Sequence, residues 1–161
     1  MTVRLATETD LGKINSIYNH YVLHDTCTYQ LTPETDEARR AWFYVHDARH
    51  PVTVAELDGS VAGWGSLNLF KEREAYIHTV ENSIYVAHTH HRRGIGAAIL
   101  RDQIARARAL GHHTIIAGIS AEQVASIGLH ERFGFVKVGH FREVGQKFGG
   151  WLDAVTYQLM L

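Results

Sequence analysis

Apolar and polar residues alternate along short segments in the first half of the chain, as is typical of β-strands with one buried face. Such segments cover Val3–Ala6, Val52–Leu57 and Val61–Leu69. The pair Asp58-Gly59 separates the last two, and both residue types tolerate the positive φ angles of a two-residue turn. The pattern therefore predicts an antiparallel hairpin over residues 52–69.

Four other segments repeat their apolar residues every three or four positions, which predicts amphipathic helices. A polar residue, Thr9 or Asp10, precedes the first, and Pro33 with an acidic turn precedes the second. A glycine follows each of the last two. The first two predicted helices end near Leu23 and Val45. The last two span Gly94–Leu110 and Ala125–Phe133.

The remaining apolar runs are short and rich in β-branched residues, which predicts further strands. A charged loop precedes two of them, and an insert over Phe141–Asp153 separates the last two. The element order is β-α-α-β-β-β-α-β-α-β-β, with the neighbouring extended segments 76–80 and 83–86 counted together, and this order is a mixed α/β fold. No repeat or linker interrupts it, so residues 1–161 are expected to form a single domain. The predicted strands cover Tyr76–Val80, Ser83–Val86, Thr114–Ile119, Phe135–Val138 and Ala154–Leu159.

Composition narrows the class of protein. The 161 residues carry 16 basic and 17 acidic side chains, and the formal charge of −1 gives no field that would attract nucleic acid or an anionic membrane. No apolar run of 18 residues and no signal-peptide core is present. The single cysteine, Cys27, excludes an internal disulfide and fits a reducing compartment, so a cytoplasmic location is expected.

The segment Ser83–Leu100 holds the strongest candidate for a binding site. It reads as a short strand, a basic turn and a helix start that contains Gly94 and Gly96. Free backbone N–H groups and the helix dipole favour an anion at such a start, and Arg92 and Arg93 add charged donors. Neither a dinucleotide-binding fingerprint nor a Walker A loop fits, because the third glycine and the Gly-Lys pair are missing. A loop glycine pair beside two solvated arginines remains the alternative.

The run His91-Arg92-Arg93-Gly94-Ile95-Gly96 resembles the pyrophosphate loop [QR]-x-x-G-x-[GA] of the GCN5-related N-acetyltransferases (GNAT), with histidine at the first position. The element order also resembles that fold. The resemblance implies a single domain with a central mixed, mostly antiparallel sheet flanked by helices, and acetyl-CoA as co-substrate.

Six segments sharpen the resemblance to one branch, the phosphinothricin and methionine sulfoximine acetyltransferases. That branch implies transfer of an acetyl group to the α-amine of a small amino acid or analogue, by direct attack in a ternary complex, and a homodimer. The segments are I-Y-N-H-Y at 17–21, F-K-E-R-E-A-Y at 70–76, T-V-E-N-S-I-Y-V at 79–86, the loop at 91–96, S-I-G-L-H-E-R-F-G-F at 126–135 and G-Q-K-F-G-G-W-L-D at 145–153.

Two residues are the catalytic candidates that the resemblance implies. Glu81 precedes the strand that pairs with the pantetheine arm in this superfamily, and it is the expected general base. Its alternative role is to accept backbone N–H bonds at a strand bulge. His130 stands where many members carry the tyrosine that protonates the CoA thiolate, and its alternative is a hydrogen-bonded core histidine.

The resemblance also implies two sets of binding residues. The cofactor set holds pantetheine along a strand edge and pyrophosphate at the helix start, and it comprises Ile84, Tyr85, Val86, His91, Arg92, Arg93, Gly94, Ile95, Gly96, Ala97, Gln123 and Ser126. The acceptor set is cationic and aromatic, suits a carboxylate-bearing amino acid, and comprises Tyr29, Lys71, Arg73, Tyr76, His78, Lys147 and Trp151. The alternative for residues 71–74 is a solvated charge run.

Other functions are weighed against this one. The histidines at 88–91 and 112–113 lack the ligand pattern of a structural zinc site, so no metal is expected. Cys27 has no partner for covalent catalysis. A GNAT enzyme for another amine and a CoA-binding sensor without turnover remain open, whereas a nucleic-acid-binding module lacks a basic stripe.

Overall fold

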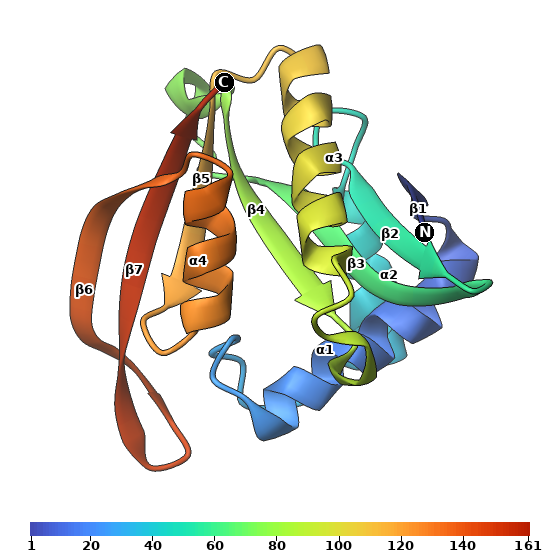
Figure 1. The fold of residues 1–161 in the computed structure, drawn as a ribbon, viewed down its shortest axis with the longest axis horizontal. Coiled ribbons are helices and arrows are strands. Elements are labelled where there is room, and N and C mark those ends of the chain that lie inside the picture. Colours follow the sequence, from blue (N-terminus) through green and yellow to red (C-terminus); the bar gives the residue numbers. More distant parts are fainter.

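The computed structural model describes residues 1–161, in which seven strands form one continuous sheet in the order β1-β2-β3-β4-β5-β7-β6 (Figure 1). Only the β4–β5 pair is parallel, so the predicted mixed, mostly antiparallel sheet is confirmed. None of the helices combines the length and apolar composition that crossing a bilayer requires. The strands are β1 (Thr2–Leu5), β2 (Val52–Leu57), β3 (Ser60–Leu69), β4 (Thr79–Val86), β5 (Thr114–Ser120), β6 (Val136–Lys147) and β7 (Gly150–Met160), and the helices are α1 (Leu11–His24), α2 (Asp36–Val45), α3 (Ile95–Ala109) and α4 (Val124–Arg132).

Helices cover both faces of the sheet, each over its own apolar cluster. On one face, Leu100 and Ile104 of α3 pack with Val80 of β4, and α4 lies beside them. On the other face, α1 packs against β2 and β3 around the fully buried Trp64, and Tyr85 joins this cluster. Because side chains alternate along a strand, residues 80, 82 and 84 of β4 face α3, whereas 81, 83 and 85 face α1 and α2.

The hairpin predicted from Asp58-Gly59 is confirmed. Both residues have positive φ angles, 54° and 78°, and they connect Leu57 directly to Ser60 across a two-residue turn. These angles match the primed turns that suit the twist of paired strands.

The segment expected as two extended pieces, 76–80 and 83–86, is one strand. Tyr76 ends a 3-10 turn that begins at Glu74, and β4 then runs without interruption from Thr79 to Val86. Its antiparallel ladder with β3 spans Leu69↔Val80 to Gly63↔Val86, so Glu81 and Asn82 lie within the ladder. The polar Glu-Asn pair made a continuous buried strand look broken.

The prediction that an insert over residues 141–153 separates the last two strands is also wrong. The two last strands continue through it, and Lys147 pairs with Gly150 at the end of a long hairpin. The ladder is irregular between Phe141 and Gly145, and Glu143 and Phe148 adopt positive φ angles. Most of β6 is solvent-exposed, so its sequence lacks the apolar alternation that would have revealed a strand.

Candidate active site

A gap between β4 and β5 dominates the centre of the sheet. The two strands pair only over Thr79–Glu81 and Thr114–Ile116, and beyond this point they diverge, as Figure 1 shows. Residues 82–86 therefore have no strand partner on the β5 side, although β3 pairs with them on the other. An open backbone edge can pair with an extended amide-bearing chain, in the way that a peptide adds to a sheet.

The N-terminus of α3 lies at the open end of this gap (Figure 1). Gly94 caps the helix with φ 79°, a left-handed conformation that glycine adopts without strain. The first helical hydrogen bond is Ala98 N–H to the Gly94 carbonyl, at 3.0 Å, so the amides of residues 95–97 precede it and are free. The amides of Arg93 and Gly94 also have no acceptor in the protein. Five consecutive free N–H groups make an anion site.

The basic side chains of this loop differ in the contacts that they make within the protein. Nε2 of His91 lies 2.7 Å from the Tyr21 hydroxyl, which also donates to the Val86 carbonyl. This contact ties the loop to α1. Arg93 is within 3.7 Å of Asp58, whereas Arg92 is exposed and has no ion-pair partner. Arg92 also has φ 62°, an unusual angle for a side chain with a Cβ.

Glu81 lies where the gap begins, as the last β4 residue that pairs with β5. Its side chain is half-buried and faces α1 and α2. No side chain or amide donates to the carboxylate, and burial alone raises its pKa. A Cβ at Gly118 of β5 would come within 3.2 Å of Glu81 Oε1, so a glycine on the neighbouring strand leaves room for the carboxylate. A carboxylate without a cation or donor is poised to take a proton.

A row of polar side chains extends from Glu81 along the same face of the sheet. Asn68 lies directly opposite Glu81, and Ser66 opposite Ser83. The Asn68 amide donates to the Glu81 carbonyl at 3.1 Å and to Ser83 Oγ at 3.2 Å, and its oxygen accepts from Ser66 Oγ at 3.0 Å. This network fixes the β3 and β4 side chains beside the carboxylate.

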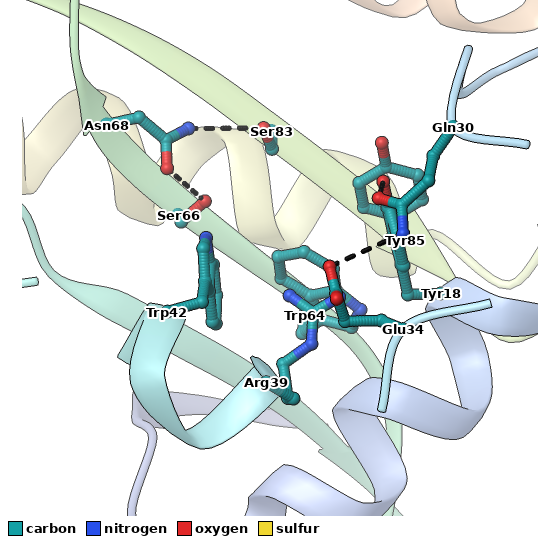
Figure 2. Close-up of a pocket in the computed structure, with 10 residues that line it drawn as sticks. All are labelled: Tyr18, Gln30, Glu34, Arg39, Trp42, Trp64, Ser66, Asn68, Ser83 and Tyr85. Carbon is teal, nitrogen blue, oxygen red and sulfur yellow. Dashed lines mark hydrogen bonds between the residues drawn. The ribbon is translucent and has the colours of Figure 1, made fainter. Parts of the chain in front are cut away.

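A cavity of about 180 Å³ adjoins this row, between α2 and the β3–β4 ladder (Figure 2). Ser66, Asn68 and Ser83 lie on one side of it, and aromatic side chains with Arg39 form most of the rest. The residues that line it are Tyr18, Gln30, Glu34, Arg39, Trp42, Trp64, Ser66, Asn68, Ser83 and Tyr85.

His130 is almost fully buried under β4, on the face opposite Glu81. Nδ1 is 2.8 Å from the Ser126 carbonyl and therefore donates, so Nε2 accepts from the Asn82 amide at 3.1 Å. Burial lowers the pKa of His130, so the ring is neutral near pH 7. Both nitrogens are occupied, and this geometry favours the core role over that of an acid for the thiolate.

Two of the expected acceptor residues instead hold the loop after α1 to the sheet. The buried ammonium of Lys147 donates to the backbone carbonyls of Thr28 at 2.8 Å and Tyr21 at 3.3 Å. The Tyr29 hydroxyl donates to the Asp153 carbonyl at 2.7 Å, and its ring fills the space over Gly145. Lys147 is thus corrected from an acceptor-binding cation to a structural tie, because its charge is already hydrogen-bonded away from solvent.

The remaining acceptor candidates do not form one cluster. Nζ of Lys71 lies 5.2 Å from the ring centroids of both Phe70 and Tyr76, and neither Lys71 nor Arg73 is in an ion pair. His78 is separate, since its Nδ1 contacts the Gly111 carbonyl at the end of α3, on the face away from Glu81. Trp151 is 62% exposed on the β6–β7 hairpin. Lys71, Arg73 and Tyr76 therefore remain the candidates, and His78 is set aside.

The residues at the start of α4 also differ from expectation. The Gln123 amide donates to Asp25 Oδ1 at 2.7 Å and to Thr26 Oγ1 at 3.2 Å, so it fastens α4 to the loop after α1. This replaces the expected cofactor contact. Ser126 engages His130 through its carbonyl, and its hydroxyl is free.

Several residues of the site were not singled out from the sequence. They are the polar residues Ser66, Asn68 and Asn82, the buried Arg39 and the glycine at 118. Only Ser66 and Asn68 had a signal in the sequence, because they are polar residues two positions apart in an otherwise apolar strand, which places them on one face. No group of three or more His, Cys, Asp or Glu side chains is arranged to hold a metal ion.

Comparison with known proteins gives a consistent result. Residues 14–135 match the Acetyltransferase (GNAT) family. The chain is 39% identical to the L-methionine sulfoximine/L-methionine sulfone acetyltransferase of Salmonella typhimurium, over all of this chain and 95% of that protein. A phosphinothricin acetyltransferase from Sinorhizobium meliloti, solved with AcCoA, superposes with a TM-score of 0.96 at 35% identity, over 99% of this chain and 88% of that one. A ribosomal-protein-alanine N-acetyltransferase from Brucella melitensis superposes with a TM-score of 0.97 at 39% identity, over the full length of both chains.

Proposed function

Because this chain belongs to the GNAT family of acetyltransferases, we propose that it transfers the acetyl group of acetyl-CoA to the α-amine of a small amino acid or amino-acid analogue. The observation that carries this proposal is the Glu81 carboxylate, which is half-buried and unpaired at the point where β4 and β5 separate. The substrates in the names of the relatives, methionine sulfoximine, methionine sulfone and phosphinothricin, support the acceptor class.

The gap and the α3 N-terminus fit acetyl-CoA, which joins a linear amide chain to a pyrophosphate. The free edge of residues 84–86 would pair with the pantetheine amides, and the amides of residues 93–97 would hold the pyrophosphate, with Arg92 in support. A Cβ at Gly96 would lie 3.3 Å from Leu129 Cδ2, so glycine avoids a tight contact between the start of α3 and α4. When bound, acetyl-CoA supplies a thioester carbonyl that an amine can attack.

Glu81 acts as the general base. An α-amine has a pKa near 8 and is mostly protonated at pH 7, so it loses one proton to solvent before it attacks as the neutral amine. Its nitrogen forms the new bond to the acetyl carbon while the carbon–sulfur bond breaks. The sulfur leaves as the thiolate of CoA, and a second proton passes from the attacking nitrogen to Glu81 and then to the sulfur. The raised pKa of Glu81 brings its basicity closer to this task.

Transfer is direct, without an acetyl-enzyme. Cys27 is the only thiol in the chain, and burial, with Asp25 nearby, raises its pKa to about 12. A thiol this weakly acidic holds almost no thiolate at pH 7, and the thiolate is the nucleophile.

Lys71 and Arg73 bind the carboxylate of the acceptor. Both precede Glu81 on the β3–β4 connection, and neither is neutralised by an ion pair. Two cations would repel a polyamine. A protein N-terminus is the second candidate acceptor, because a ribosomal-protein-alanine N-acetyltransferase is equally similar.

We also propose that the enzyme is a homodimer formed through the β6–β7 hairpin. Single exposed apolar residues are ordinary, but a group of large ones on one hairpin indicates an interface. The exposed hairpin residues are Val136, Val138, Phe141, Val144, Phe148 and Trp151.

We propose the cytoplasm as the location of the enzyme, because a reducing compartment suits the lone Cys27. There, acetylation would confer resistance to a toxic amino-acid analogue.

The test of the proposed function is CoA-thiol release with acetyl-CoA and a panel of amines. The panel comprises phosphinothricin, methionine sulfoximine, methionine sulfone, common amino acids, a polyamine and a peptide that begins with alanine. Turnover limited to the amino acids and analogues is expected. Turnover of the peptide or the polyamine alone would replace the acceptor, and tight acetyl-CoA binding without turnover of any amine would indicate a sensor.

The pH dependence of kcat/KM for the acceptor should contain two ionisations. As the pH falls below about 8, the amine becomes protonated and log kcat/KM should decline with a slope of 1. As it falls further through the raised pKa of Glu81, above the ordinary 4.5, the base is lost too and the slope should reach 2. Rate profiles with a stability control at each pH would measure this. A slope of 1 down to pH 4.5 would argue against Glu81 as the base.

Arg92→Gly should weaken acetyl-CoA binding about 10-fold while leaving the protein equally or more stable. Glycine relieves the positive φ of 62°, which is strained for arginine. The lost guanidinium removes a charge-assisted hydrogen bond to phosphate, worth about 1.5–3 kcal/mol. Titration calorimetry and a melting curve measure both effects, and Arg92→Lys, which keeps the charge, is the control. Unchanged affinity in Arg92→Gly would place Arg92 outside the phosphate site.

A further inference from the structure

We propose that His46, Asn68 and Ser83 form a hydrogen-bond relay that positions the acceptor in the site. The outer end of this relay is an imidazolium, and its inner end is a hydroxyl proton directed at the acceptor. The inference rests on the proposed function, since it places the α-amine of the acceptor at Glu81. Figure 2 shows the inner part of the relay, where Asn68 joins Ser66 to Ser83 beside the cavity.

The orientation of the Asn68 side chain is fixed by its neighbours. Its nitrogen lies 3.1 Å from the backbone carbonyl of Glu81, which can only accept a hydrogen bond, so the NH₂ group faces that carbonyl. Its oxygen therefore faces the other way, toward Ser66 Oγ at 3.0 Å and His46 Nε2 at 3.0 Å. An amide oxygen has no proton to give, so His46 donates from Nε2.

The second ring nitrogen of His46 also meets an oxygen that can only accept. Nδ1 lies 2.8 Å from the backbone carbonyl of Trp42. This carbonyl is one of the last four of α2, which have no donor within the helix. A neutral imidazole donates from one nitrogen, whereas an imidazolium donates from both. The two contacts together therefore require the doubly protonated ring.

The place of His46 in the fold suits a positive charge. It is the C-cap residue of α2, where the helix dipole favours a cation. No carboxylate forms an ion pair with it, and the adjacent Asp47 pairs with His50 at 2.8 Å. The Trp42 ring lies between His46, at 4.5 Å, and the opposing charge of Arg39, at 4.6 Å. The helix dipole and the two oxygen acceptors thus hold the proton on the ring.

Each step of the relay donates toward the acceptor site. His46 donates to the Asn68 oxygen, and the Asn68 NH₂ group donates to Ser83 Oγ at 3.2 Å. Because Ser83 Oγ accepts this bond, its own proton points away from Asn68 and is free for a ligand. Successive hydrogen bonds polarise one another, so a cation at the outer end strengthens the donor at the inner end.

The acceptor group that matches this donor is the carboxylate of the amino acid. Ser83 is two residues from Glu81 on the same face of β4, a separation of about 6–7 Å. The carboxylate of an α-amino acid is bonded to the carbon that bears the amine, so an amine at Glu81 places the carboxylate between the two side chains. Ser83 thus binds the carboxylate together with Lys71 and Arg73, through a charge-assisted hydrogen bond.

The test measures steady-state kinetics of Ser83→Ala and His46→Leu with acetyl-CoA and methionine sulfone. Ser83→Ala should raise the KM for the acceptor about 10-fold, the cost of one hydrogen bond to a charged group. Its kcat and its KM for acetyl-CoA should stay within about twofold of wild type, because this contact is made equally before and during the reaction. His46→Leu should raise the acceptor KM about 3- to 10-fold, because Asn68 can then turn away from Ser83.

Two further variants and one spectrum complete the test. His46→Gln keeps one N–H donor and should recover part of the lost affinity. His50→Leu, whose side chain bonds Asp47 rather than the relay, is the matched control and should retain wild-type kinetics. Nitrogen-15 NMR should find a proton on both ring nitrogens of His46 in the folded enzyme, and the absence of the signal in His46→Leu assigns it.

The outcomes separate this inference from the proposed function. An acceptor KM within twofold of wild type in Ser83→Ala or in His46→Leu would overturn the relay, even where the melting temperature falls, since a loss of stability alone means a helix cap. A His46 ring with one protonated nitrogen would overturn its cationic end. If His46→Leu unfolds, Ser83→Ala and His46→Gln decide. Absence of wild-type turnover with every amino acid overturns the function, and the inference falls with it.

Discussion

Replacing Glu81 with glutamine is expected to lower kcat/KM for the acceptor by about 10²- to 10⁴-fold, the usual contribution of a general base. Glutamine keeps the shape of the side chain but cannot take a proton. The KD for acetyl-CoA should not change, because the proposed cofactor contacts lie on the backbone of residues 84–86 and 93–97. Steady-state kinetics and calorimetric titration measure the two quantities.

The same substitution should leave the protein at least as stable as wild type. The Glu81 carboxylate is half-buried without a donor or cation, and the neutral amide removes this unpaired charge. Glu72→Gln, in the exposed β3–β4 loop, is the matched control and should retain wild-type kinetics. Retention of full activity by Glu81→Gln would mean that solvent or another group takes the proton.

The second large effect is expected from Gly65→Ala, which should destabilise the fold by about 2–3 kcal/mol through overpacking. A Cβ there would lie 2.6 Å from both Gln103 Nε2 and Ile99 Cγ2, and 2.9 Å from the Ser83 carbonyl. Gln103 is fully buried and donates from Nε2 to the carbonyls of Ser66 at 3.1 Å and Ser83 at 2.9 Å. The extra methyl group therefore displaces a residue that holds β3 and β4 to α3.

For a domain of this size the melting temperature should fall by roughly 4–12 °C. Gly12→Ala is the matched control, because no atom lies within 4 Å of the added Cβ in α1. Alanine there should raise stability slightly, by about 0.5–1 kcal/mol. An unchanged melting temperature in Gly65→Ala would mean that α3 can move away from the sheet without cost.

Local sequence patterns were sufficient to predict the fold where one residue type restricts the backbone conformation. Asp58-Gly59 fixed a two-residue turn, and Gly94 marked the start of α3, because positive φ angles restrict the choice of residue. Strands β4 and β6 were harder to predict. Glu81 and Asn82 interrupt an apolar run within β4, and most of β6 is exposed, so neither follows a simple apolar pattern.

Only part of the candidate site could be predicted from the sequence, for a different reason. A sequence names the residue types but not their hydrogen-bond partners. Lys147 looked like a free cation, yet it is buried against two carbonyls, and Gln123 looked free for cofactor, yet it holds Asp25. Strand alternation alone separates His78 from Glu81, and it could have grouped Asn68 with Ser66. The charge of Arg39 gave no hint of burial among aromatic rings.

Direct acetyl transfer to an amino-acid α-amine can be tested by product analysis with acetyl-CoA and methionine sulfone as substrates. Mass spectrometry should find Nα-acetyl methionine sulfone and CoA thiol in a 1:1 ratio, with the mass of the enzyme unchanged. CoA release without acetylated product would contradict acetylation of the α-amine, and an enzyme heavier by one acetyl group that it then transfers would contradict direct transfer.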